Sequence, residues 1–168
     1  MDLLQSFEPI IGSDPRIMIL GSMPGVASLD AQQYYAHPRN AFWPIVGELF
    51  GVEWSEDYAQ RVIQFQRLPL VLWDVLRNCQ RAGSLDADIE AHNLVANDIA
   101  RVLRDYPAVS VIAFNGATAH LLFRRHVLHR LDQGCQPALL RLPSTSPANA
   151  RLDLAAKLDR WRVLLDHL

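Results

Sequence analysis

Residues 109–116 read Val-Ser-Val-Ile-Ala-Phe-Asn-Gly, a short apolar run that stops at an Asn-Gly pair. A run this short and this apolar is typical of a β-strand covered on both faces, as in parallel sheets. The helical pattern Gly116–Leu131 follows it at once. Because parallel strands are joined by crossover helices, this stretch predicts one strand–helix unit of an α/β domain.

Three further apolar runs predict the other strands: Arg16–Leu20, Leu70–Trp73 and Ala138–Leu142. Helical patterns lie between or after these runs, over Asn40–Phe50, His92–Tyr106 and Leu152–Leu165. This alternation predicts a three-layer α/β/α sandwich around a four-stranded parallel sheet. The chain has 168 residues, so we expect one domain, 1–168, that buries roughly 70% of its unfolded surface.

The composition excludes several classes of protein. Half of the residues are hydrophobic, which excludes disorder, and no apolar run approaches the roughly 20 residues of a membrane span. The first residues lack the pattern of a secretory signal. Cys79 and Cys135 are the two cysteines, too few for a four-thiolate metal site or a disulfide framework. We therefore expect a cytoplasmic protein without a metal or other cofactor.

Charge is unevenly distributed along the chain. Residues 1–100 carry six arginines and thirteen acidic residues, whereas residues 101–168 carry nine arginines and one lysine against five aspartates. Such asymmetry suggests that one face meets an anion, although a solvated helix face would give the same pattern.

Three conspicuous segments begin where predicted strands end: Gly21–Gly25, Asn115–Gly116 and Pro143–Asn149. In α/β sheets, ligands bind at the carboxyl ends of the strands, so these segments predict a shared site. Glycines around Pro24 let backbone N–H groups approach a ligand, and the Asn115 amide can read a planar heterocycle. Each segment also has a simpler interpretation as a turn or a helix cap.

The segment from Tyr34 to Trp43 gathers aromatic residues, a histidine, an arginine and an asparagine at a helix start. Asn40 can cap that helix, and Asn149 can cap the last one. A hydrolase built on Ser22 and His37 is a competing hypothesis, but no G-x-S-x-G motif supports it. His126 and His129 are spaced like metal ligands, but no carboxylate or cysteine completes a set.

Taken together, these segments resemble the uracil-DNA glycosylase superfamily, and most closely its sixth family, the hypoxanthine-DNA (DNA-deoxyinosine) glycosylases. The matching pieces, in the family's order, are Gly21–Gly25, Tyr35–Trp43, Leu72–Val75, Phe114–Gly116 and Leu142–Asn149. The resemblance implies a monofunctional, metal-independent enzyme that removes deaminated bases from DNA during base excision repair. The expected bases are hypoxanthine and also uracil or xanthine, and the expected enzyme acts as a monomer without a membrane partner.

The resemblance also implies residue roles. Base contacts fall on Gly21, Ser22, Met23, Pro24, Gly25, Tyr35, Trp73 and Asn115, and DNA contacts on Ser144, Thr145, Ser146, Pro147, Asn149 and Arg151. Many superfamily members place Asp or Asn where this chain has Met23, and the sixth family is thought to use the asparagine that matches Asn40 as the catalytic residue. The alternative is an inactive DNA- or nucleotide-binding module of the same fold.

Overall fold

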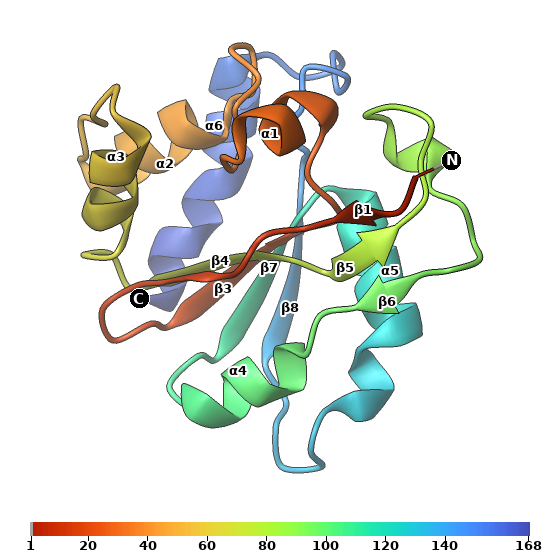
Figure 1. The fold of residues 1–168 in the computed structure, drawn as a ribbon. Helices are drawn as coiled ribbons and strands as arrows, with labels where there is room; N and C mark the ends of the chain where they lie inside the picture. The colour runs from red at the N-terminus through yellow and green to blue at the C-terminus, as the bar shows by residue number, and fades with distance from the viewer. Residues whose placement is uncertain (1) are drawn as a thin grey trace.

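The apolar runs form the central sheet of the computed structural model, which describes residues 2–168 (Figure 1). Four of them are parallel neighbours: β3 (Ile17–Gly21), β4 (Leu70–Asp74), β7 (Val111–Asn115) and β8 (Ala138–Leu142). A two-residue strand, β2 (Ile10–Ile11), pairs antiparallel with β4 and gives the order β2-β4-β3-β7-β8. The four predicted parallel strands are confirmed, and the sheet has one short antiparallel edge strand in addition.

Helices cover both faces of this sheet (Figure 1). On one face lie α2 (Phe42–Phe50), α3 (Tyr58–Phe65) and α6 (Leu154–Trp161), and on the other lie α4 (Ile99–Asp105) and α5 (Ala117–His126). Successive strand residues point to opposite faces, so Ile17 and Ile19 join the first core and Met18 and Leu20 the second. The predicted three-layer sandwich is confirmed.

A small second sheet, one short helix and three 3₁₀ turns complete the described chain. They are α1 (Val26–Ala31), the antiparallel strands β1 (Leu4–Gln5), β5 (Leu76–Cys79) and β6 (Val95–Ala96), and the 3₁₀ turns η1 (Asp86–Asp88), η2 (Leu128–Arg130) and η3 (Arg162–His167). Strands β1, β5 and β6 form a separate small sheet in the order β1-β5-β6. None of the helices within residues 2–168 has the length and apolar character needed to cross a membrane.

The helix predicted over His92–Tyr106 is wrong in its first half. Helix α4 begins at Ile99, where the Asp98 side chain accepts a hydrogen bond from the amide of Arg101 at 3.1 Å. The Asn97 side chain is buried and donates to the carbonyls of Asp74 and Leu76. These bonds hold residues 95–97 beside β4 and β5, so this part of the chain pairs as a strand instead of joining the helix.

Candidate active site

An open cavity of about 610 Å³ lies at the carboxyl edge of the parallel strands, where the strand-end segments were expected to meet. Its wall brings together segments that are far apart in the sequence, namely the turn after β3, the loop before α2, the loop after β8 and the chain between β5 and β6. Thirteen of the predicted site residues line it: Gly21, Ser22, Met23, Pro24, Gly25, Tyr35, Asn40, Asn115, Ser144, Thr145, Ser146, Pro147 and Asn149.

Two predicted site residues do not reach the cavity wall. Trp73 was expected to contact the base, but its side chain belongs to the second core and its indole N–H donates to the carbonyl of Phe7 at 2.9 Å. Trp73 does not line the cavity because strand alternation turns it into the second core, whereas its neighbour Asp74 lines the cavity. Arg151 is exposed, just beyond the lining loop.

The Asn115 amide is the centre of a hydrogen-bond network at the end of β7. Its Nδ2 donates to Tyr35 Oη at 3.1 Å and to Thr145 Oγ1 at 2.9 Å, while its Oδ1 accepts from the Thr145 amide at 2.9 Å. Burial, and next the nearby Asp74 carboxyl, raise the pKa of Tyr35, so its hydroxyl keeps its proton. The network therefore fixes the loop before α2 and the loop after β8 relative to the sheet.

Tyr35 is held in an unusual conformation. Its backbone φ of 53° lies in the left-handed region that non-glycine residues rarely adopt, and one face of its ring stacks on Phe42 with centroids 4.1 Å apart. Only the other ring face is left for a planar ligand. A strained backbone that is fixed on several sides is common at binding sites, because the surrounding contacts must maintain it.

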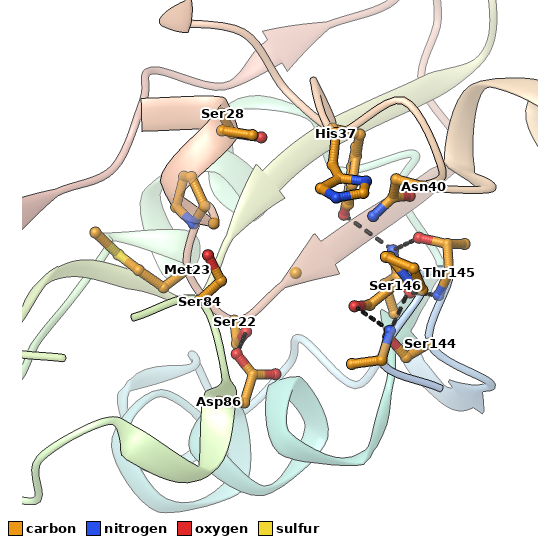
Figure 2. A pocket seen from close by; sticks show the side chains of 18 of the residues that line it. Ser22, Met23, Ser28, His37, Asn40, Ser84, Asp86, Ser144, Thr145 and Ser146 are labelled. Atoms are coloured by element: carbon orange, nitrogen blue, oxygen red, sulfur yellow. Dashed lines mark hydrogen bonds between the residues drawn. The ribbon is translucent and has the colours of Figure 1, made fainter. Parts of the chain in front are cut away.

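Asn40 stands at the start of α2 on the cavity wall. Its Oδ1 accepts from the amide of Phe42 at 3.0 Å, so it satisfies one of the free N–H groups of the helix start although Ala41 is the formal N-cap. The amide of Ala41 donates to the carbonyl of Thr145 at 3.0 Å and ties this loop to the loop after β8. Figure 2 shows His37 and Asn40 on the same side of the cavity.

The loop Ser144–Asn149 is rigid because its polar side chains bond to its own backbone. Ser144 Oγ accepts from the amide of Ser146 at 3.2 Å, and the Asn149 side chain donates to the carbonyl of Ser144 at 3.1 Å. Asn149 is therefore not the cap of the last helix, since Asp153 caps α6 instead. From α6, the buried Lys157 donates to the carbonyl of Ser146 at 3.2 Å.

Sequence reasoning missed an acidic wall opposite Asn40. Ser22 Oγ donates to Asp86 Oδ1 at 2.6 Å, as Figure 2 shows, and Asp74 lies at the end of β4. Burial raises the pKa of Asp86, against the opposing effects of the Ser22 hydrogen bond and Arg81. The one signal available in the sequence was a carboxylate that ends an otherwise apolar strand.

The positions of these side chains weigh against a hydrolase built on Ser22 and His37 and against a metal site. Ser22 is bonded to Asp86, while His37 Nδ1 accepts from the amide of Arg39, so no Ser–His pair is formed. Nowhere in residues 2–168 do three or more His, Cys, Asp or Glu side chains gather in a way that could hold a metal ion.

No arginine or lysine of residues 2–168 lines the cavity, although Asn115 and the loop Ser144–Asn149 belong to the basic half of the sequence. Helix α5 begins beside Asn115, but its arginines Arg124 and Arg125 lie in its last turn, roughly 11–12 Å from the helix start at 1.5 Å per residue. Arg39 and Arg151 are exposed next to the lining loops.

The chain is similar to proteins of known family over most of its length. The family model described as the uracil DNA glycosylase superfamily matches residues 9–165. A hypoxanthine DNA glycosylase of Methanosarcina barkeri is 36% identical over 114 residues, which cover 67% of this chain and 70% of that protein. A hypoxanthine DNA glycosylase of Methanosarcina acetivorans is 29% identical over 164 residues, covering 97% of this chain and 98% of the relative.

A solved structure shares the same fold. It is an NMR solution structure from Methanosarcina acetivorans, assigned provisionally as a uracil DNA glycosylase. It superposes with a TM-score of 0.78 at 29% identity and covers 99% of this chain and 98% of its own.

Proposed function

Because the chain belongs to the uracil DNA glycosylase superfamily, we propose that it hydrolyses the N-glycosidic bond of deaminated bases in DNA, hypoxanthine foremost. The relatives from two Methanosarcina species are hypoxanthine DNA glycosylases, which supports the choice of base. The observation that carries the proposal is the cavity, which is of ligand size and joins the strand-end segments in one wall.

The target base must leave the duplex to reach this cavity. Extruding a nucleotide costs a few kcal/mol and is cheapest at a mismatch, which favours deamination lesions over normal pairs. The rigid loop Ser144–Asn149 forms part of the wall and would press against the DNA, with the exposed Arg39 and Arg151 placed to meet phosphates. The free ring face of Tyr35 would stack on the extruded base.

Breaking the bond builds positive charge on the sugar and negative charge on the departing base. The backbone amides of Ser22 and Met23 lie in the turn that lines the cavity and would donate to that anion. One such pre-arranged donor is typically worth ~3 kcal/mol of transition-state stabilisation. The turn after β3 would therefore hold the leaving group.

Asn40 would hold the attacking water. An amide is no base near neutral pH, so it orients the water rather than deprotonating it. Its Oδ1 already accepts one bond from Phe42, which fixes the direction in which the rest of the amide points. A fixed water suits a dissociative reaction, because the sugar cation needs a well-placed nucleophile more than a strong one.

Cleavage of labelled duplexes tests the proposal directly. Duplexes with a single inosine, uracil or xanthine are incubated with the protein and then treated with alkali, which breaks the strand at abasic sites. We expect the protein to cleave the inosine duplex as a monomer and without a cofactor. Its expected role is DNA repair in the cytoplasm. Met23 favours the alternative of an inactive binding module, which would shift the duplex in a gel but leave every strand intact.

A further inference from the structure

The connection between β5 and β6, residues 80–94, holds the turn after β3 from outside the main sheet. Asp86 Oδ1 accepts from the Ser22 hydroxyl at 2.6 Å, and the Arg81 guanidinium donates to the carbonyl of Pro24. Two alternate residues of the turn are therefore bonded to this connection. Figure 2 shows four labelled side chains of the two segments together on one side of the cavity: Ser22, Met23, Ser84 and Asp86.

A third bond fixes the point where the turn enters helix α1. The helix begins at Val26, and its N-cap, Gly25, has no side chain that could bond the first amides. Ser84 supplies this bond from the connection, since its Oγ accepts from the Val26 amide at 2.8 Å. A Cβ added to Gly25 would lie 3.5 Å from Ser84 Oγ, so the two segments pack closely. The same connection thus holds the middle of the turn and its end.

The connection has its own internal support. Arg81 and Ile89 form an antiparallel β-bridge, and the amide of Glu90 donates to the carbonyl of Gln80 at 2.9 Å, which closes the base of the loop. Arg81 is 4% exposed, and its Nε donates to the carbonyl of Gly83. Burying a guanidinium costs free energy unless hydrogen bonds compensate, and these bonds join the loop to the turn. The turn is therefore held by a loop that is itself fixed.

The turn needs this support because the main sheet does not reach its middle. The pairing of β3 with β4 ends at Gly21 and Asp74. The amides proposed to stabilise the departing base, on Ser22 and Met23, come directly after this point. Backbone donors stabilise a developing anion only when they are already in place, since reorganisation during the reaction would reduce their effect.

We infer that Arg81, Ser84 and Asp86 are positioning residues of the glycosylase reaction, which hold the turn after β3 where its backbone amides meet the departing base. Their side chains act on the reaction through the turn. This inference rests on the proposed function, because it assigns the residues that position the leaving-group donors.

The test is single-turnover cleavage of an inosine duplex, measured against protein concentration to separate the maximal rate from the half-saturating concentration. Asp86→Ala removes the acceptor for Ser22 and should lower the maximal rate on the order of 100-fold, the cost of misplacing a reacting group. Asp86→Asn keeps an acceptor and should restore most of this rate. Both variants remove the same charge, so they should change the half-saturating concentration equally.

Three further variants test the other bonds. Ser22→Ala removes the donor of the same bond, so it should be as slow as Asp86→Ala, and the double variant should be no slower, because the two residues share one interaction. Ser84→Ala should lower the maximal rate roughly fivefold, the equivalent of one neutral hydrogen bond. Arg81→Lys keeps the charge but loses the planar fork that bonds two carbonyls, so it should also be slow.

Asp98→Ala is the matched control for stability. Asp98 caps α4 by a bond to the Arg101 amide at 3.1 Å and does not line the cavity, so its loss should lower Tm and leave the maximal rate unchanged. Circular dichroism and thermal melting establish that each variant is folded, and rates are measured well below the lowest Tm.

Each outcome decides between the inference and the proposed function. If Asp86→Ala or Ser22→Ala cleaves at the wild-type maximal rate, or Asp86→Asn is no faster than Asp86→Ala, the inference is overturned while the proposed function stands. If Asp86→Ala does not fold, wild-type rates in both Ser22→Ala and Ser84→Ala overturn the inference, and slow cleavage in both supports it. If the wild-type protein cleaves none of the duplexes, the inference and the proposed function are both overturned.

Discussion

Replacing Asn40 by alanine separates catalysis from helix capping. Among residues 2–168, the Asn40 side chain makes one hydrogen bond, from the Phe42 amide at 3.0 Å. Losing a bond of this kind at a helix start costs ~1 kcal/mol of unfolding free energy, which in a domain of this size lowers Tm by roughly 2–4 °C. Losing the position of the attacking water costs on the order of 100-fold in rate, or about 2.7 kcal/mol of activation free energy.

The assay is single-turnover release of hypoxanthine from an inosine duplex, with thermal melting and duplex binding measured on the same preparation. Asn40→Ala should melt slightly earlier, bind DNA normally and lose most cleavage. Asp57→Ala is the matched control, because Asp57 caps α3 by an equivalent bond to Ala59 and does not line the cavity. It should show the same loss of stability with the wild-type rate.

Adding Met23→Asn to the Asn40→Ala variant should recover part of the rate, since it places an amide in the turn that lines the cavity. An Asn40→Ala protein that melts early yet cleaves as fast as the wild type would show that Asn40 is only a capping residue. The reasoning about water positioning would then be refuted.

Four other predictions follow from the same geometry. Cleavage should persist in EDTA while duplex affinity falls steeply with added salt, as counterion release requires; loss of activity restored by zinc or magnesium would contradict this. Asn115→Ala removes three hydrogen bonds and should lower the free energy of unfolding by about 2–4 kcal/mol in a denaturant titration, with slower cleavage. Gly21→Ala would place a Cβ 2.5 Å from Asp74 Oδ1 and should reduce cleavage at least tenfold, as expected when a donor in the cavity wall is displaced. Gly134→Ala, whose added Cβ meets nothing within 4 Å, should have no effect. Because the folded-state pKa of Asp74 is raised, the wild-type protein should lose stability as pH rises from about 4 to 7, and Asp74→Asn should lose less in a melting series.

The sequence predicts the long elements of this fold because their signals are local. Four apolar runs have the length and composition of buried strands, and their bounds differ from the observed ones by at most two residues. The two-residue strands β1, β2 and β6 have no such signal, because two residues cannot show a period. Helices α1 (six residues) and α3 (eight residues) were not predicted.

The sequence predicted which segments line the cavity where a motif follows a strand end, and it missed lining residues that tertiary contacts bring there. The turn at Gly21–Gly25 and the loop at Ser144–Asn149 follow strands directly, so the parallel sheet brings them together. Asp86 reaches the cavity from a long connection between β5 and β6, held by its bond with Ser22. Nothing in the local sequence around Asp86 specifies that approach.

Two kinds of contact hold the cavity wall in place: strand pairing in the sheet and hydrogen bonds between loops. Gly21 and Asp74 sit at the ends of adjacent strands, paired in register within the sheet, whereas Asn40 stands on a loop joined to the rest of the wall by the bond between Ala41 and Thr145. A change at a strand end also acts on the loop that carries Asn40, because the Asn115 amide at the end of β7 bonds to Tyr35 and Thr145. A substitution at this edge of the sheet can therefore change the accepted base and leave hydrolysis intact only if it preserves these bonds.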